Sequence, residues 1–224
     1  MKVSVVVPVC NMEDTVEKTI QSIVENIEIE DYECIIVDAG STDRTCEICI
    51  ELQKNNKHIS FAQMYKATKS EAMNLGMNIS LGEYLYFIDG DCLLCANFII
   101  KAIACLDENK NVDIFARKSY VTGFNNQIIT NLFFENKIGP LLPLCVFRKS
   151  AINVKFENEI CNDIIFSGKI LYKNQRYYID YSNESFTVIN NLENNFNEID
   201  YTKLFDIDWL KYAQEEITKF VENN

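Results

Sequence analysis

The chain has 224 residues, of which 48% are hydrophobic and 24% are charged, and its formal net charge is −12. This size and composition indicate a soluble globular protein of one large domain or two small ones. The negative charge argues against unspecific binding to nucleic acid or anionic lipid, because both reward lysine and arginine. The longest apolar segment, residues 93–106, is interrupted by Asn97 and Lys101 and is too short to span a bilayer.

The N-terminus and the cysteines indicate the compartment. The sequence MKVSVVVPVC enters a strand-like pattern at once, so we expect no signal peptide and a cytoplasmic location. Nine cysteines, an odd number, suit a reducing compartment better than a set of disulfides. The two C-x-x-C pairs, which begin at Cys46 and Cys92, lie far apart among apolar residues. Small buried side chains are therefore a better interpretation than structural zinc.

Strand-like and helix-like segments alternate in the first part of the chain. The patterns predict strands at residues 2–7, 33–37, 58–64 and 84–88. They predict helices at residues 14–26, at 43–54 after the capping cluster 41–43, and from the Thr68-x-x-Glu71 capping box to residue 79. This order predicts an α/β fold with a doubly wound, mostly parallel sheet that has helices on both faces.

After residue 92 the pattern loosens. We expect helices at residues 97–106, 163–172 and 209–221 and short strands at 112–115, 127–130 and 144–147. We interpret residues 1–224 as one domain with three parts, residues 1–92, 93–190 and 191–224. The last helix has an apolar stripe, which we expect to dock on the chain's own sheet; a dimer or membrane-side contact is the alternative. The stripe consists of Leu210, Ala213, Ile217, Phe220 and Val221.

The most informative stretch is EYLYFIDGDC at residues 83–92. Its apolar run suits a strand that is buried on both faces. Asp89 and Asp91 follow that run and point the same way if the chain stays extended. Two carboxylates this close are unfavourable without a positive charge between them, and Mg²⁺ and Mn²⁺ prefer carboxylate oxygens. The pair therefore predicts a divalent-metal site, with a solvated loop as the alternative.

Two earlier strands also end in polar residues, in VVVPVCN (5–11) and IIVDAGSTD (35–43). In open parallel sheets, ligands bind beyond the carboxyl ends of the strands. Asp38 lies at such an end, and the next residues lead into a helix whose amides could face an anion or a ribose. A simple helix cap is the alternative at Asp38.

Other ligand motifs fit poorly. The first turn has no glycine, so a Rossmann site is excluded, and an EF-hand would need glycine and glutamate where Leu94 and Ile100 stand. A haloacid-dehalogenase-type phosphatase remains a distant rival, because its apolar strand also ends in D-x-D. That fold normally opens with the D-x-D strand, whereas three strands come first here.

Together these segments resemble the family-two glycosyltransferases, inverting enzymes of the GT-A fold that use nucleotide sugars. The resemblance covers VSVVVPVCN, IIVDAGSTDRT, SEAMNLGMNISLGEYLYFIDGD and NDIIFSGKIL. It implies a nucleotide-binding half (1–92), an acceptor-side half with a smaller sheet region (93–190) and a C-terminal helical extension (191–224). In this family Pro8 and Val9 would line the nucleotide base, and Asp38 would hydrogen-bond the uracil or ribose.

The resemblance also assigns the residues near the diphosphate. Asp89 would contact the ribose side, and Asp91 would bind the Mn²⁺ or Mg²⁺ that bridges the diphosphate. Asn74 would belong to the nucleotide site. Met73 stands where many relatives have an arginine, which removes the family's basic contact at that position.

Inverting transfer needs a base opposite the departing diphosphate, and a carboxylate suits this role. The resemblance places it at Asp163, where the family's acidic pair ends; Asn162 replaces the first acid. A plain helix cap is the alternative for Asp163, and Glu157 and Glu159 are the fallback candidates.

The expected function is transfer from a UDP-sugar to a glycan or lipid-linked acceptor in bacterial polysaccharide biosynthesis. The chain lacks the Q-x-x-R-W motif of processive members, so a single addition is expected. A catalytically silent subunit that binds the nucleotide sugar is the alternative. A homodimer and a contact with the inner face of the membrane are left open.

Overall fold

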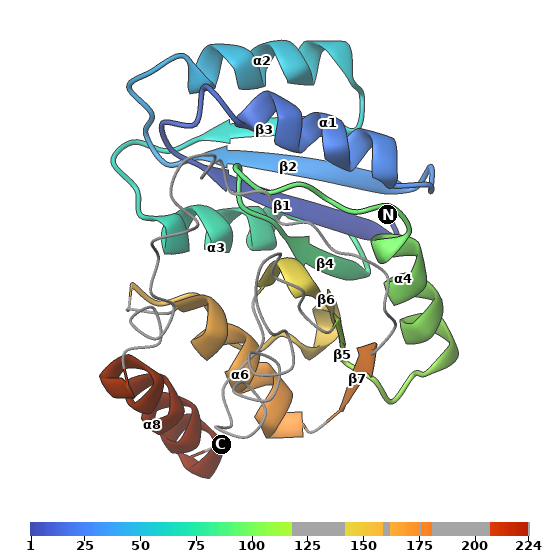
Figure 1. Ribbon diagram of the computed structural model, residues 1–224, viewed down its shortest axis with the longest axis vertical. Coiled ribbons are helices and arrows are strands. Elements are labelled where there is room, and N and C mark those ends of the chain that lie inside the picture. The colour runs from blue at the N-terminus through green and yellow to red at the C-terminus, as the bar shows by residue number, and fades with distance from the viewer. Residues whose placement is uncertain (118–141, 159–161, 175, 181–206, 224) are drawn as a thin grey trace, which may run out of the picture.

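The computed structural model describes residues 1–117, 142–158, 162–174, 176–180 and 207–223. The strand predicted at 127–130 and the fallback candidate Glu159 lie outside these residues. Seven strands form one sheet in the order β3-β2-β1-β4-β6-β5-β7 (Figure 1). The strands are β1 (Val3–Val9), β2 (Tyr32–Asp38), β3 (Ile59–Gln63), β4 (Tyr84–Phe87), β5 (Ile114–Arg117), β6 (Cys145–Arg148) and β7 (Tyr177–Asp180).

The sheet is mostly parallel. β1 pairs in parallel with β2 and β4, β2 with β3, and β5 with β7. Only β6 runs the other way within the described strands, since it is antiparallel to both β4 and β5. The predicted mostly parallel α/β fold is confirmed. The strands of the second half extend the same sheet beyond β4, so the smaller sheet region is one edge of it.

Helices cover both faces of the sheet (Figure 1). They are α1 (Val16–Asn26), α2 (Thr45–Asn55), α3 (Lys69–Ile79), α4 (Phe98–Glu108), α6 (Asn162–Asn174) and α8 (Ile207–Asn223). Two short 3-10 turns, η1 (Leu142–Leu144) and η2 (Lys149–Ala151), flank β6. One core forms between the sheet and α1 and α4, and a second forms between the sheet and α3 and α6.

The position of strand β4 between two cores explains why its sequence is apolar without interruption. Tyr84 and Tyr86 point into the core on the α1 and α4 side, whereas Leu85 and Phe87 point into the core on the α3 and α6 side. All four side chains are fully buried. Side chains alternate between the two faces of a strand, so a strand covered on both faces needs apolar residues at every position.

The C-terminal helix differs from its prediction. α8 packs against α6 instead of the sheet. Ile217 is buried, and the ammonium groups of Lys169 and Lys173 lie 5.6 and 5.4 Å from the centre of the Phe220 ring. Packing on α6 covers part of the apolar stripe, so α8 forms an outer layer of the fold. None of the described helices is long and apolar enough to cross a bilayer.

One predicted helix start is confirmed, whereas another helix start and one short strand differ from the predictions. The capping box of Thr68 and Glu71 forms as predicted. The start of α2 does not use the cluster 41–43 as its N-cap, since the N-cap is Arg44 without a side-chain hydrogen bond. Asp43 accepts instead from the amide and hydroxyl of Thr45, at 3.0 and 2.6 Å. Strand β7 was not predicted, because it is a short edge strand with two half-exposed tyrosines.

The strand order creates a crevice at one point. From β1 the chain builds outward through β2 to β3 and then returns to place β4 on the other side of β1. The crossover helix α3 therefore lies on the face of the sheet opposite α1, and such a switch point is where open α/β sheets bind ligands. Candidate site residues follow both strands.

Candidate functional site

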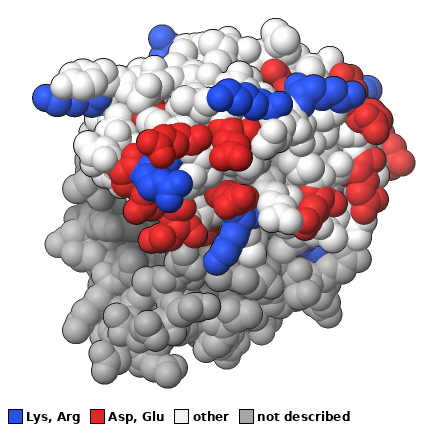
Figure 2. Space-filling view, turned by 90° about the horizontal axis from the view of Figure 1, so that it is seen from above, with Lys and Arg blue, Asp and Glu red and all other residues white. Residues whose placement is uncertain are grey.

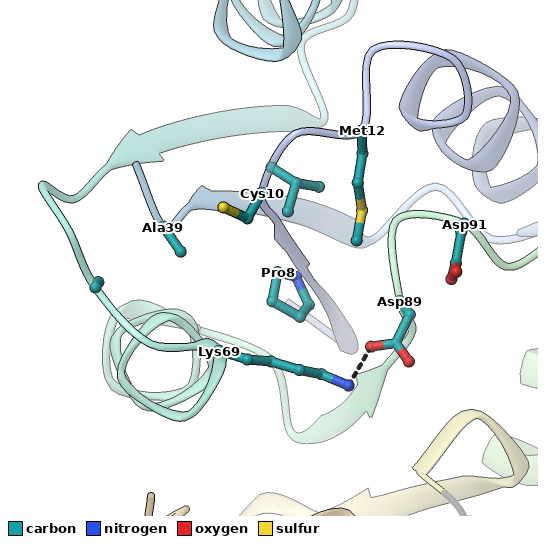
Figure 3. A pocket seen from close by; sticks show the side chains of 9 residues that line it. Pro8, Cys10, Met12, Ala39, Lys69, Asp89 and Asp91 are labelled. Atoms are coloured by element: carbon teal, nitrogen blue, oxygen red, sulfur yellow. Dashed lines mark ion pairs between the residues drawn. The ribbon is translucent and has the colours of Figure 1, made fainter. Parts of the chain in front are cut away.

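A pocket of about 350 Å³ opens at this switch point (Figure 3). This volume lies in the range of small-molecule sites. The structure brings together four of the predicted site residues there, since Pro8, Val9, Asp89 and Asp91 all line it. The lining is completed by Cys10, Met12, Ala39, Ala67 and Lys69, which sequence reasoning did not assign to the site.

The apolar wall of the pocket is held by contacts between two loops. Asn11 has a φ of 52°, a left-handed conformation that asparagine tolerates, and its side-chain oxygen accepts from the Thr42 amide at 2.8 Å. The Met12 amide donates to the Thr45 hydroxyl at 2.7 Å. These bonds join the β1–α1 and β2–α2 loops, so they fix the position of Met12 over the pocket.

The aspartate pair is fixed by the glycine between its members. A Cβ on Gly90 would come within 2.6 Å of the Met12 sulfur and 2.7 Å of Val9 Cγ1, so no larger residue fits without movement. The Gly90 carbonyl accepts from the hydroxyls of Thr15 and Thr19, each at 2.9 Å. α1 and the loop before it therefore hold the D-x-D loop against the pocket.

The D-x-D loop also offers the chemistry for a cation. Ligand atoms of Asp89, Asp91 and Cys92 lie within 4.8 Å of one another, the one such cluster among the described residues. Burial raises the pKa of the Cys92 thiol, which therefore stays neutral. The two carboxylates remain as hard oxygen ligands, and one or two carboxylates plus phosphate oxygens suit Mg²⁺ or Mn²⁺. The residues present fit such an ion.

Asp38 lies outside the pocket lining. Its carboxylate is fully buried and accepts from the Gly40 amide at 3.1 Å, from the Ser41 amide and hydroxyl, and from the Cys46 thiol at 3.2 Å. It therefore shapes the β2–α2 loop, as the helix-cap alternative anticipated in part. Its contact with a uracil or ribose stays a prediction.

Asn74 also faces the chain instead of the pocket. Its amide nitrogen donates to the Phe156 carbonyl at 2.8 Å, and its oxygen accepts from the Phe156 amide at 2.9 Å. The hydroxyls of Thr68 and Ser70 bind Asn158 and the Glu157 carbonyl, at 2.6 and 2.8 Å. We call these contacts the α3 clamp. The clamp holds the segment that leads into α6, and a nucleotide contact of Asn74 stays a prediction.

Lys69 joins the two predicted halves. Its ammonium lies 2.7 Å from Asp89 Oδ1 and 3.3 Å from Asp163 Oδ2 (Figure 3 shows the first pair). Burial lowers the pKa of Lys69, but the two carboxylates outweigh it and raise the pKa above its ordinary value. Sequence reasoning missed this residue. The feature that could have identified Lys69 is its position as the first residue of α3. The positive end of a helix disfavours lysine there unless acidic groups face it.

Asp163 lies in the first turn of α6, outside the pocket lining, and Lys69 joins it to Asp89. Burial raises its pKa, the Lys69 ammonium acts in the opposite direction, and nearby Asp89 adds to the rise. Its Oδ2 accepts from Lys69, whereas Oδ1 is buried with no hydrogen-bond partner among the described residues. No backbone amide of that part of the chain donates to Oδ1, so a pure capping role does not explain the side chain.

Comparison with known proteins identifies the family. A sequence profile described as "Glycosyl transferase family 2" matches residues 4–159. The chain belongs to glycosyl transferase family 2. The resemblance and the GT-A fold are thereby confirmed, and the phosphatase alternative is wrong, because the D-x-D pair follows the fourth strand of a family-two sheet.

Two curated relatives are similar over part of their length. Poly(ribitol-phosphate) beta-N-acetylglucosaminyltransferase TarP of Staphylococcus aureus is 27% identical over 211 residues, which cover 86% of this chain and 64% of the relative. Glycosyltransferase GlyA of Streptococcus pneumoniae is 36% identical over 90 residues, or 40% of this chain and 13% of the relative. The chain thus spans less than two thirds of these relatives.

Solved structures share the fold. Residues 1–349 of S. aureus TarS superpose with a TM-score of 0.68 at 23% identity, over 83% of this chain and 59% of those residues. The same protein has been solved in complex with UDP-GlcNAc, with a TM-score of 0.64. The mannosyltransferase PcManGT of Pyrobaculum calidifontis, in complex with GDP-Man and Mn²⁺, has a TM-score of 0.65 at 18% identity, over 80% and 53% of the two chains.

Proposed function

We propose that this chain is an inverting glycosyltransferase that moves a sugar from a nucleotide diphosphate sugar, most simply a UDP-sugar, to a hydroxyl of a glycan or lipid-linked acceptor. One observation carries the proposal. Next to the switch point of a family-two sheet, Asp89 of the Asp89-Gly90-Asp91 loop and the half-buried carboxylate of Asp163 share a single ammonium group. A donor-side acid pair and a separate acid for the acceptor are the groups that inverting transfer needs.

The pocket offers a donor site of suitable shape and polarity. Pro8, Val9 and Met12 form an apolar wall for a nucleotide base, and Asp89 and Asp91 form the polar end. A uridine nucleotide is the first donor to test, because TarS has been solved with UDP and with UDP-GlcNAc. Asp91, with Asp89 beside it, would hold Mn²⁺ or Mg²⁺. A cation bound there stabilises the negative charge that develops on the departing diphosphate.

Asp163 acts as the general base in this proposal. Its carboxylate accepts the proton of the acceptor hydroxyl while the hydroxyl oxygen attacks the anomeric carbon from the side opposite the diphosphate. The bond between that carbon and the phosphate oxygen breaks, and the configuration inverts. The products are the new glycoside, the nucleoside diphosphate and a protonated Asp163.

The proposal also covers the acceptor and the cellular compartment. TarP is named for a poly(ribitol phosphate) acceptor, so a polyol-phosphate polymer is the first acceptor to test. We propose a cytoplasmic enzyme, because nucleotide sugars and a reduced set of cysteines both suit that compartment. With a lipid-linked acceptor it would work at the inner face of the membrane.

The test begins with thermal shift against UDP, UDP-GlcNAc, UDP-glucose and GDP-mannose, each with and without Mn²⁺. A ligand that binds only the folded state raises the melting temperature, so the pattern identifies the nucleotide and its metal requirement. Transfer to ribitol-phosphate oligomers is then measured with the donor that binds. If no nucleotide sugar shifts the melt, the proposal is wrong. Binding without any transfer would favour the silent subunit.

Asp163→Asn is the decisive variant. Both residues suit the first turn of a helix, so the protein should stay folded and its UDP affinity should stay within about twofold, whereas transfer should fall by about 10² to 10⁴ because the base is lost. Glu157→Gln is the matched control, since it neutralises the nearby exposed fallback carboxylate and should keep most of the activity. Full loss in Glu157→Gln with activity retained in Asp163→Asn would exchange the two roles.

A further inference from the structure

We infer that Lys69 is a positioning residue that links the donor side of the site to the acceptor side: its ammonium holds Oδ2 of Asp163 and Oδ1 of Asp89 together, so that the Asp163 carboxylate keeps one orientation beside the D-x-D loop. This inference rests on the proposed function and adds a residue to it. It starts from one contact pattern, in which a single Nζ lies 2.7 Å from one carboxylate and 3.3 Å from another.

The three groups come from separate elements. Asp89 follows β4, Asp163 belongs to the first turn of α6, and Lys69 is the first residue of α3. The same end of α3 carries the α3 clamp, which holds residues 156–158 shortly before α6. The first turns of α3 thus fix both the backbone that leads into α6 and the carboxylate that α6 presents.

Stability alone does not account for this lysine. About 42% of its side chain is exposed, and ion pairs at such exposure contribute little to folding free energy. A lysine in the first turn of a helix is also opposed by the positive end of the helix dipole. Lys69 is the one basic side chain among the described residues that line the pocket. Met73, one turn further along α3, is apolar and buried in the core. The position of Lys69 is better explained by the site.

The pairing has a consequence for the base. The χ2 torsion of an aspartate is broad and roughly twofold, so an unrestrained carboxylate turns freely. Lys69 engages one oxygen of Asp163 and leaves the other, Oδ1, buried and without a partner among the described residues. It also separates two carboxylates that would otherwise repel each other. The orientation of the Asp163 carboxylate is then fixed by Lys69 at Oδ2 and by the packing that buries Oδ1.

The experiment compares Lys69→Met with Lys69→Arg. Lys69→Met keeps the length of the side chain and removes its charge. We expect kcat for transfer to fall about 10²-fold, the effect of a catalytic group misplaced by about 1 Å, while the donor Kd by calorimetry changes less than about threefold. Lys69→Arg restores the charge and should recover kcat to within about tenfold of wild type. Lys66→Met is the matched control, because Lys66 lies in the preceding loop against the Tyr65 ring and outside the pocket lining.

Two results would overturn the inference. A wild-type kcat in Lys69→Met would remove Lys69 from the reaction, and an equal loss of donor affinity and kcat would make it a donor-binding group. Either result leaves the proposed function intact if Asp163→Asn still loses transfer.

A second readout does not depend on activity. If Lys69 holds Asp163, the change in melting temperature of the Lys69→Met/Asp163→Asn double variant should be smaller than the sum of the single changes. Additive changes would contradict the contact. This cycle tests the link even if the wild-type protein binds no nucleotide sugar, a result that would overturn the proposed function alone.

Discussion

Asp89 and Asp91 differ in their surroundings although one residue separates them. Asp89 is paired with the Lys69 ammonium, whereas none of the ion pairs among the described residues involves Asp91. Asp91 Oδ1 accepts a hydrogen bond from the neutral thiol of Cys92, at 3.5 Å. The acidic charge without a cation partner is therefore that of Asp91, which is the better candidate for a metal ion.

Asp91→Asn should abolish Mn²⁺-dependent binding of UDP and leave the fold intact, because the substitution removes a charge without changing the size of the side chain. Calorimetry with UDP, in the presence of Mn²⁺ and of EDTA, should show at least a tenfold loss that is confined to the metal condition. Asp31→Asn, at an exposed aspartate that pairs with the N-terminus, serves as the control. Unchanged affinity and unchanged metal dependence in Asp91→Asn would rule out the D-x-D metal site.

Sequence reasoning succeeded for residues whose place follows from a strand. Pro8, Val9, Asp89 and Asp91 lie at or just after the ends of adjacent strands, so the sheet topology alone brings them together. The sequence does not indicate which way a polar side chain points when its hydrogen-bond partner lies far along the chain. Asn74 is such a case, because its partner Phe156 is 82 residues away.

Helix α3 is the element that connects the two parts of the site. Its capping box was readable from the local sequence, because both partners lie within one turn. The α3 clamp was not, because its partners lie 82 to 90 residues further along the chain. The packing of α8 on α6 escaped prediction for the same reason: an apolar stripe indicates that a helix is covered, but not by which element.

Asn74→Ala should weaken the α3 clamp. The substitution removes two hydrogen bonds, each with a net contribution of about 1 kcal/mol, so the free energy of unfolding should fall by about 1–3 kcal/mol. The Phe156 amide should exchange with deuterium faster, and transfer should fall more than UDP binding. Asn78→Ala is the matched control, since it replaces an exposed asparagine one turn further along the same helix. Equal denaturation midpoints for the two variants would show that the clamp contributes nothing to stability.

At the scale of the whole molecule, acidic side chains form several patches on the face that carries α1 and α2 (Figure 2). Some acidic side chains form ion pairs and hydrogen bonds within the fold. Lys2 lies 2.9 Å from Glu83 and 2.8 Å from Asp107, and the Tyr84 hydroxyl donates to Asp107 at 2.8 Å. Burial raises the pKa of Asp107, but the hydrogen bonds from Lys2, Tyr84 and Lys110 outweigh it and lower the pKa below its ordinary value. This network joins the N-terminus to α4.

The lowered pKa of Asp107 predicts the sign of one pH effect. A carboxyl group whose pKa is lower in the folded state stabilises the fold above its unfolded pKa, about 3.9, and this contribution is lost as the pH falls through the folded pKa. The wild type should therefore be more stable than Asp107→Asn at pH 7, and the difference should shrink below about pH 4. Urea denaturation of both proteins from pH 7 to pH 3 checks this. A difference that stays constant over the series would contradict the assigned role.

The order of the strands has a consequence for the way the chain matures on the ribosome. The last residue of the β1 to β4 part of the sheet is Phe87. Strand β6 covers the free edge of β4, but it begins about 58 residues later, at Cys145. At a synthesis rate of about 5–20 residues per second, the apolar strand YLYF keeps an open edge for about 3 to 12 s. Open apolar edges pair with other chains. Fragments that end between β4 and β6 should therefore aggregate, and chaperone demand should be highest while that stretch emerges.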